Sequence, residues 1–360
     1  MITYVFFMLV LFYVLFYKEI LATYYLLFVI FVIKLTFILI YYYQNEYVGL
    51  MDDFTYYKHG KALLIYTPEQ LLFSNAINLL FMLSGSHFLY TFLNHCVYYF
   101  FGDNIMNMLL FNLFVFVMIG YFGKKIYSDV FNASRCIPVF CIIYFLYPDM
   151  WAFGYLNLKD FVVALLLAIQ IYCTLVISKP NGKVYNKVFC FIFIVLTLFL
   201  LLFIRYYTIL LYLLSVTLWM TYKYYDWKFT KIQLAFAIVF TPFIIGFYDF
   251  AISPFFLTVN PSYQFLQIPA LINWFLLYPI LLLGLIKLIK DNNKKAMLLV
   301  FYMNCTCAFY AILGFSVGIS GPRQRVFVEF IYVILITYGI KVIKDLVSDN
   351  ADGHIIKIVN

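Results

Sequence analysis

The stretch FCFIFIVLTLFLLLF, residues 189–203, decides the fold of this chain. It contains no charged residue, and LAIQIYCTLVI at residues 167–177 has the same apolar character. Such runs are too continuous for a membrane barrel, whose strands alternate between apolar and polar positions. Inside a bilayer every backbone N–H and C=O needs a partner within the chain, so a helix is the remaining solution. The two stretches therefore predict membrane-spanning helices.

The composition extends this prediction to the whole chain. Of the 360 residues, 66% are hydrophobic and only 11% are charged, and the mean hydropathy is +0.97. A soluble domain is typically about half apolar and about a quarter charged. Too few polar side chains remain to cover a surface in water, so lipid must surround most of the molecule. We therefore predict an all-α fold, a polytopic transmembrane helical bundle.

Apolar segments long enough to cross a bilayer, roughly 20 residues each, follow one another along almost the whole chain. The predicted spans are 2–17, 20–43, 86–101, 105–122, 136–148, 158–178, 188–204, 206–222, 232–250, 269–290, 296–319 and 324–340. The segment 69–84 is either a further span or an amphipathic helix on the membrane surface. We expect 10–13 crossings in one transmembrane domain, residues 1–345, followed by a short cytoplasmic tail, residues 346–360.

Basic residues gather in five clusters between the predicted spans. The clusters are Lys124 and Lys125; Lys179, Lys183 and Lys187; Lys223, Lys228 and Lys231; Lys287, Lys290, Lys294 and Lys295; and Lys341 and Lys344. Two predicted spans separate each cluster from the next, so all five can lie on one side, which the positive-inside rule makes cytoplasmic. The net charge of +8 then reflects topology, and we expect no nucleic acid partner.

The loops on the opposite side carry polar residues that are not topology signals. Asp52 and Asp53 lie in the longest of these loops, residues 44–68. They are either two solvated loop acids or a site in which one carboxylate faces a cavity and acts as a general base. Mg²⁺ or Mn²⁺ is conceivable here, but no further oxygen ligands accompany the pair. We therefore predict no cofactor and no metal site.

Lys159 and Asp160 open the predicted helix 158–178 on the same side. An acidic residue at this place complements the helix dipole, and a lysine can extend its ammonium group to the interface, which is one interpretation of the pair. The other is a structured loop, rich in proline and aromatic residues, that leads into a site. We count Asp160 among the candidate catalytic residues and Lys159 among the candidate phosphate ligands.

Arginines head two later helices at this boundary. Arg205 separates two apolar runs, and Arg323 and Arg325 follow the stretch SVGISGP before the last span. Arg205 is either an interfacial anchor or a phosphate clamp, because guanidinium binds phosphate bidentately. Pro322 suits a first helical turn, which places Arg323 and Arg325 near a helix N-terminus that favours phosphate. Glu329 lies one turn from Arg325 and can pair with it.

Three segments resemble bacterial membrane glycosyltransferases of the GT-C-like kind and, among them, O-antigen (Wzy-type) and exopolysaccharide polymerases. DDFTYYKHGKAL (52–63) is similar to their acidic and aromatic first outer loop. PDMWAFGYLNLKDFVVALLL (148–167) is similar to their proline–aromatic–basic–Asp helix start. RYYTILLYLL (205–214) and GPRQRVFVEFIYVILITYGI (321–340) are similar to their arginine-headed later helices. These motifs cover about 60 residues, and the hydropathy pattern covers the whole chain.

The resemblance implies glycosyl transfer at the outer face of the bacterial inner (plasma) membrane. The donor would be an oligosaccharide on undecaprenyl diphosphate, with membrane lipid and a chain-length regulator protein as further partners. Arg205, Arg323, Arg325 and Lys159 would hold the leaving phosphate, while Asp52, Asp53 or Asp160 would take the proton of the acceptor hydroxyl. A single-sugar transferase that uses a polyprenyl-phosphate donor and a flippase for the lipid-linked oligosaccharide are the alternatives.

Overall fold

The computed structural model describes residues 28–29, 31–36, 38–40, 51–74, 76–132, 136–154, 156–225, 267–317 and 322–351. Within these ranges the regular elements are helices, with no strand. They are α3 (Met51–Ala62), α4 (Pro68–Phe73), α5 (Ala76–Ser84), α6 (Phe88–Phe101), α7 (Ile105–Phe131), α8 (Ile137–Leu146), α9 (Pro148–Phe153), α10 (Lys159–Ile177), α11 (Val184–Arg205), α12 (Tyr207–Tyr225), α15 (Gln267–Ile272), α16 (Tyr278–Lys290), α17 (Met297–Val317) and α18 (Pro322–Ala351). The predicted polytopic helical fold is confirmed.

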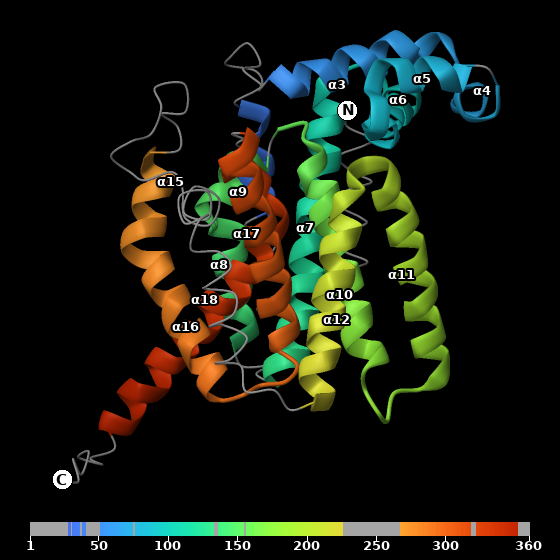
Figure 1. The fold of residues 1–360 in the computed structure, drawn as a ribbon. Helices are drawn as coiled ribbons and strands as arrows, with labels where there is room; N and C mark the ends of the chain where they lie inside the picture. The colour runs from blue at the N-terminus through green and yellow to red at the C-terminus, as the bar shows by residue number, and fades with distance from the viewer. Residues whose placement is uncertain are drawn as a thin grey trace.

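The long helices pack side by side as an upright bundle (Figure 1). Among the described residues, five helices are long and apolar enough to cross a membrane; α5 and α6 are apolar enough together, but the chain bends by 115° between them. At about 1.5 Å per residue, helices of 19 to 27 residues reach across a hydrocarbon core of about 30 Å. The predicted spans 2–17 and 232–250 lie outside the described residues, so the expected 10–13 crossings stay a prediction.

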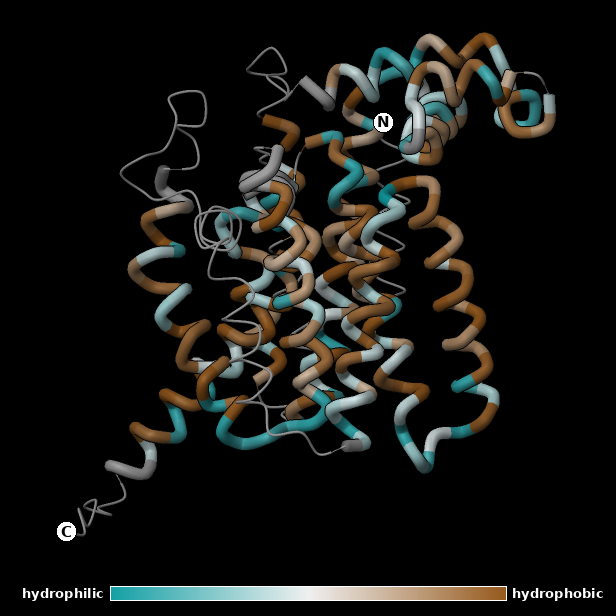
Figure 2. The backbone as a smooth tube through the Cα atoms, in the orientation of Figure 1, coloured by the Kyte–Doolittle hydropathy of each residue, from teal (hydrophilic) through white to brown (hydrophobic). Residues whose placement is uncertain are grey.

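The basic clusters meet at one end of the bundle, which we call the lysine end. Lys179 Nζ lies 2.6 Å from a carboxylate oxygen of Asp129, and Lys295 Nζ donates to the Asp129 carbonyl. Trp219 Nε1 donates to the carbonyl of Lys294. In α18, Tyr338 donates to Asp291. These contacts agree with the prediction that the described clusters lie on one side of the membrane. Figure 2 shows hydrophilic residues gathered at this end of the bundle.

The same contacts give the direction of each helix. The helices α7, α10, α12, α16 and α18 run toward the lysine end, and α8, α11 and α17 run away from it (Figure 1). The opposite end, which we call the site end, therefore contains the starts of α7 and α10 and the turn between α11 and α12. The predicted turn at Arg205 and the predicted helix start at Lys159 are both found here.

The segment α3–α6 lies across the site end (Figure 1), and this corrects the predicted span 86–101. His87, just before α6, bonds to the Ile204 carbonyl at the site end. The other end of α6 is followed almost at once by α7, which also begins there. Because both ends of α6 lie on the same side, this helix does not cross the bundle. The 14 residues of α6 pack against α3 instead.

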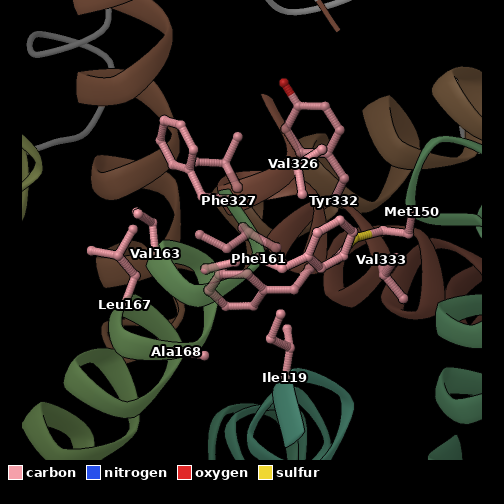
Figure 3. Close-up of a cluster of buried hydrophobic side chains, with 14 of the residues drawn as sticks. Ile119, Met150, Phe161, Val163, Leu167, Ala168, Val326, Phe327, Tyr332 and Val333 are labelled. Carbon is pink, nitrogen blue, oxygen red and sulfur yellow. The ribbon is translucent and has the colours of Figure 1, made fainter. Parts of the chain in front are cut away.

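The core below the site end is built from α7, α9, α10 and α18 (Figure 3). Phe161 of α10 lies among Ile119 of α7, Met150 of α9, and Phe327 and Val333 of α18. Lipid is as apolar as these side chains, so their close packing, more than hydrophobic transfer, holds the helices together. By contrast, many apolar side chains of α11 are exposed and suit contact with lipid.

Candidate functional site

A cavity opens at the site end, where α3 crosses the start of α10. Its volume is about 330 Å³. Small-molecule sites typically measure about 300–1,000 Å³, so this cavity is of the size that binds a ligand. The lining residues are Thr55, Tyr56, His59, Leu83, Ser84, His87 and Lys159. Two imidazoles, one ammonium group and three hydroxyl groups therefore surround a space beside the membrane boundary.

A sharp bend between α5 and α6 brings His87 to the cavity. The sequence SGSH (84–87) interrupts the apolar run, and the direction of the chain changes by 115° between the two helices. Gly85 adopts a φ of +54°, a left-handed conformation that costs a residue with a Cβ about 1–2 kcal/mol. Across the bend, Ser84 Oγ donates to Thr91 Oγ1 at 2.6 Å. The bend is thus fixed by backbone conformation and one hydrogen bond.

The His87 ring has a defined tautomer. Its Nδ1 lies 2.8 Å from the carbonyl oxygen of Ile204, and a carbonyl oxygen only accepts, so Nδ1 carries the hydrogen. In the neutral ring the lone pair is then on Nε2. Burial lowers the pKa of His87, and the nearby Lys159 charge lowers it further. Burial also lowers the pKa of His59. Both rings are consequently neutral near pH 7.

Lys159 and Asp160 occupy the first turn of α10, directly beneath the cavity. The Lys159 ammonium group lies 5.8 Å from the centre of the Tyr56 ring, within cation–π range. Asp160 is fully buried and forms an ion pair with Arg205 at the end of α11. The guanidinium group also lies 5.4 Å from the Phe327 ring of α18. One charge pair thus joins α10, α11 and α18 next to the cavity.

Amide side chains hold the loop that leads into α10. Asn157 Nδ2 donates to Asn94 at 2.8 Å, and Tyr90 donates to the Asn157 side-chain oxygen at 2.7 Å. Asn112 Nδ2 donates to the Leu156 carbonyl at 2.6 Å. These groups come from α6 and α7 and are buried, so their hydrogen bonds fix the loop strongly. The position of Lys159 is set by this network.

A second charged cluster, which we call the arginine cluster, lies deeper between α9 and α18. Arg325 is fully buried and lies 2.5 Å from Asp149 and 3.2 Å from Glu329. Asn273 donates to the same Asp149 oxygen at 3.0 Å and begins a π-helical turn, residues 273–277. The predicted pairing of Glu329 with Arg325 is confirmed. Arg325 is committed to carboxylates in this structure and does not line the cavity.

The structure brings together three of the predicted site residues. Lys159, Asp160 and Arg205 lie at the cavity or directly beside it, whereas Arg325 belongs to the arginine cluster. Asp52 and Asp53 lie in the first turn of α3, and Arg323 in the first turn of α18; their side chains lie outside the described residues. Among the described residues, no three His, Cys, Asp or Glu side chains form a metal-binding group.

Sequence reasoning missed His59, His87 and Asp149. The histidines lack metal-ligand spacing, which is a poor guide because a catalytic imidazole needs only one partner. The signal for His87 was the small-residue break SGSH within an apolar run. Asp149 follows Pro148 inside the quoted 148–167 motif, but its partner Arg325 lies 176 positions away. No local pattern reveals a pair separated so far along the chain.

No family model and no curated protein matches the sequence. Among solved structures, the crystal structure of ArnT from Cupriavidus metallidurans in the apo state is similar, with a TM-score of 0.58 and 14% sequence identity. The fold is ArnT-like. The likeness covers 90% of this chain but only 62% of the ArnT chain. At this identity it shows the fold alone, that of a polytopic helical membrane protein.

Proposed function

We propose that this protein is a membrane glycosyltransferase that takes a sugar from a polyprenyl-linked donor at the site end of the bundle. The observation that carries the proposal is the cavity with Lys159 in its wall, next to the Asp160–Arg205 pair, in an ArnT-like fold. A phosphate headgroup needs cationic donors where lipid meets water. The cavity wall supplies one such donor, Lys159, and a second, Arg205, lies beside the cavity.

The reaction forms one bond and breaks one. An acceptor hydroxyl attacks the anomeric carbon, and the bond from that carbon to the lipid phosphate breaks with its electron pair on the phosphate. Lys159 stabilises the charge that develops on the leaving oxygen. Arg205 has five N–H donors, so it can hold Asp160 and a phosphate oxygen together. Asp160 then keeps the guanidinium group in place, and we assign it this positioning role.

The helical register of α3 distinguishes the two acids predicted from the sequence. Position 52 precedes Thr55 by three residues, Tyr56 by four and His59 by seven, which is the spacing of one helical face. Thr55, Tyr56 and His59 all line the cavity. This register makes Asp52, ahead of Asp53, the first acid to substitute in a test of the predicted carboxylate base.

The finer proposal is an O-antigen or exopolysaccharide polymerase acting in the bacterial inner membrane on undecaprenyl-diphosphate-linked repeat units. The motif resemblance supports it. The test is deletion of the gene in its own host, followed by gel analysis of the surface glycan. A core that carries a single repeat unit indicates a polymerase. Loss of even that unit indicates an earlier transferase or a flippase, and an unchanged glycan contradicts both the polymerase and the transferase.

The site itself is tested with purified protein in liposomes that contain a labelled undecaprenyl-phosphate or undecaprenyl-diphosphate sugar. We expect Lys159→Met to lower kcat/KM by about 10²–10³-fold, the usual cost of losing one donor to a developing oxyanion. Arg205→Lys should keep more activity than Arg205→Met, because it keeps the charge beside Asp160. Lys183→Met, at the lysine end, is the control. An equal loss in all variants would place the chemistry elsewhere.

A further inference from the structure

We propose that His87 is the general base of the transfer reaction, with its Nε2 accepting the proton of the attacking hydroxyl. The inference rests on the proposed function and adds the residue that takes the proton. Sequence reasoning expects a carboxylate in this role. The described residues instead place an imidazole in the cavity wall, beside the ammonium group of Lys159 that would meet the donor phosphate.

The orientation of the ring is the first argument. A general base must present a lone pair to the cavity and keep its ring still. The Nδ1–H of His87 donates to the Ile204 carbonyl at 2.8 Å, which assigns the lone pair to Nε2 and holds the ring by its opposite edge. Ile204 directly precedes Arg205, so the same helix end that holds the imidazole also carries the phosphate-binding arginine.

The charges around the ring are the second argument. Burial disfavours protonation of His87 most, and the charges of Lys159 and Arg205 add to this effect, while the hydrogen bond to the Ile204 carbonyl and the charge of Asp160 oppose it. His59 shares the cavity wall and is itself held neutral by burial. The net result is a pKa of His87 below the ordinary value of 6.5. The ring is therefore in its basic form at neutral pH and is ready to accept a proton.

The neighbouring acid is the third argument. Asp160 is fully buried and forms an ion pair with Arg205, so its carboxylate is engaged by the guanidinium group. His87 bonds instead to a neutral group, the carbonyl of Ile204. We therefore assign the Asp160–Arg205 pair to binding of the leaving phosphate and His87 to deprotonation of the acceptor hydroxyl.

The proton balance is simple. As the acceptor oxygen bonds to the anomeric carbon, its hydrogen passes to Nε2 and the ring becomes an imidazolium. The lipid phosphate leaves with the electron pair of the broken bond. The imidazolium then releases its proton to water through the cavity, which restores the neutral ring. The new cation forms beside the departing phosphate, so it also lowers the energy of the charged products.

The test is the dependence of kcat/KM on pH in the liposome assay. For the wild type we expect the rate to fall on the acid side with a midpoint below pH 6.5, as His87 becomes protonated. His87→Asn keeps a side-chain amide that can donate to the Ile204 carbonyl but removes Nε2. It should lower kcat by about 10²–10⁴-fold, leave KM nearly unchanged, and abolish the acid limb.

Two further variants complete the test. His87→Ala leaves a space in the cavity wall, and added imidazole should restore part of its rate, which a purely structural role would not permit. His59→Asn should retain the acid limb, since His59 is not the base. If the wild type transfers no sugar, the proposed function fails. If the wild type is active but His87→Asn keeps its rate and acid limb, or if imidazole rescues nothing, His87 is not the base.

Discussion

Buried charge is the most informative feature at the scale of single residues. Arg205, Arg325, Asp149, Asp160 and Glu329 are all buried in a bundle whose core is mainly apolar and aromatic. Each arginine has a carboxylate partner, as expected, because an unpaired charge in such surroundings is costly. The pairs therefore fix how the helices that carry them approach one another.

The arginine cluster predicts a large effect on stability. We expect Arg325→Met to lower the free energy of unfolding by about 3–5 kcal/mol, because it leaves Asp149 and Glu329 buried without their cation. The measurement is thermal unfolding in detergent, monitored by circular dichroism. Lys61→Met is the control, since the Lys61–Asp103 pair is exposed to solvent. Equal melting temperatures for the two variants would show that the cluster contributes nothing to stability.

At the scale of elements, α16 and α18 touch backbone to backbone. A Cβ on Gly284 would overlap the carbonyl oxygen of Leu335, and a Cβ on Gly339 would overlap that of Ile280. Small residues allow such close approach of membrane helices, where packing replaces the hydrophobic effect. The sequence shows these glycines, but only the structure shows that they face one another across a helix pair.

This contact predicts that Gly284→Ala separates the two helices. The added methyl group meets rigid backbone, so we expect a loss of about 1–3 kcal/mol in the free energy of unfolding, the usual cost of overpacking. Gly182→Ala is the matched control, because its Cβ would meet mainly the flexible end of Lys187. Thermal unfolding of the two variants decides the matter, and a more stable Gly284→Ala protein would contradict the close contact.

The bend at Gly85, between α5 and α6, leads to a further prediction at the scale of elements. Space around Gly85 is open, so only its left-handed backbone limits substitution. We expect Gly85→Val to lower kcat of sugar transfer by displacing His87, while Gly85→Asn is milder because asparagine tolerates this conformation. The chain itself uses Asn132 and Asn292 at φ of 49° and 51°. Equal activities of the two variants would rule out backbone strain as the constraint.

The sequence predicted most of the elements but fewer of their contacts. The apolar runs and the single charge at Arg205 located the bounds of α10 to within one residue and those of α11 and α12 to within four, because a span must be long and uninterrupted. The same hydropathy misplaced α6, since an apolar helix of 14 residues looks alike whether it crosses a bilayer or lies on one. The partners Asp160 and Arg205 were both singled out, but not their pairing, which depends on tertiary packing.

At the scale of the whole molecule, the lysine end and the site end lie on opposite sides of the bundle. Ser74 follows α4 at the site end, and Lys183 precedes α11 at the lysine end; both are exposed. If the lysine end is cytoplasmic, a membrane-impermeant thiol reagent added to intact cells should label Ser74→Cys. It should label Lys183→Cys only after the membrane is opened.

The parent protein is the control for this labelling, because its seven cysteines are all free; five are buried, and the half-buried Cys96 and Cys136 set the background. Labelling of Lys183→Cys alone in intact cells would reverse the topology and would place the cavity on the cytoplasmic side. A donor made inside the cell would then reach the cavity without crossing the membrane. The experiment therefore decides which leaflet supplies the substrate.

The directions of the helices have a final consequence for the electric field of the molecule. Among the described helices, α7, α10, α12, α15 and α18 begin on the cavity side, and α8, α11 and α17 finish there. A helix start is equivalent to roughly half a positive charge and a helix finish to roughly half a negative charge. The start of α10 lies beside the cavity, so it adds to this face a positive potential that no side chain provides. An anion approaching the cavity is attracted before it meets Lys159, and this attraction persists at every pH at which the helices remain folded.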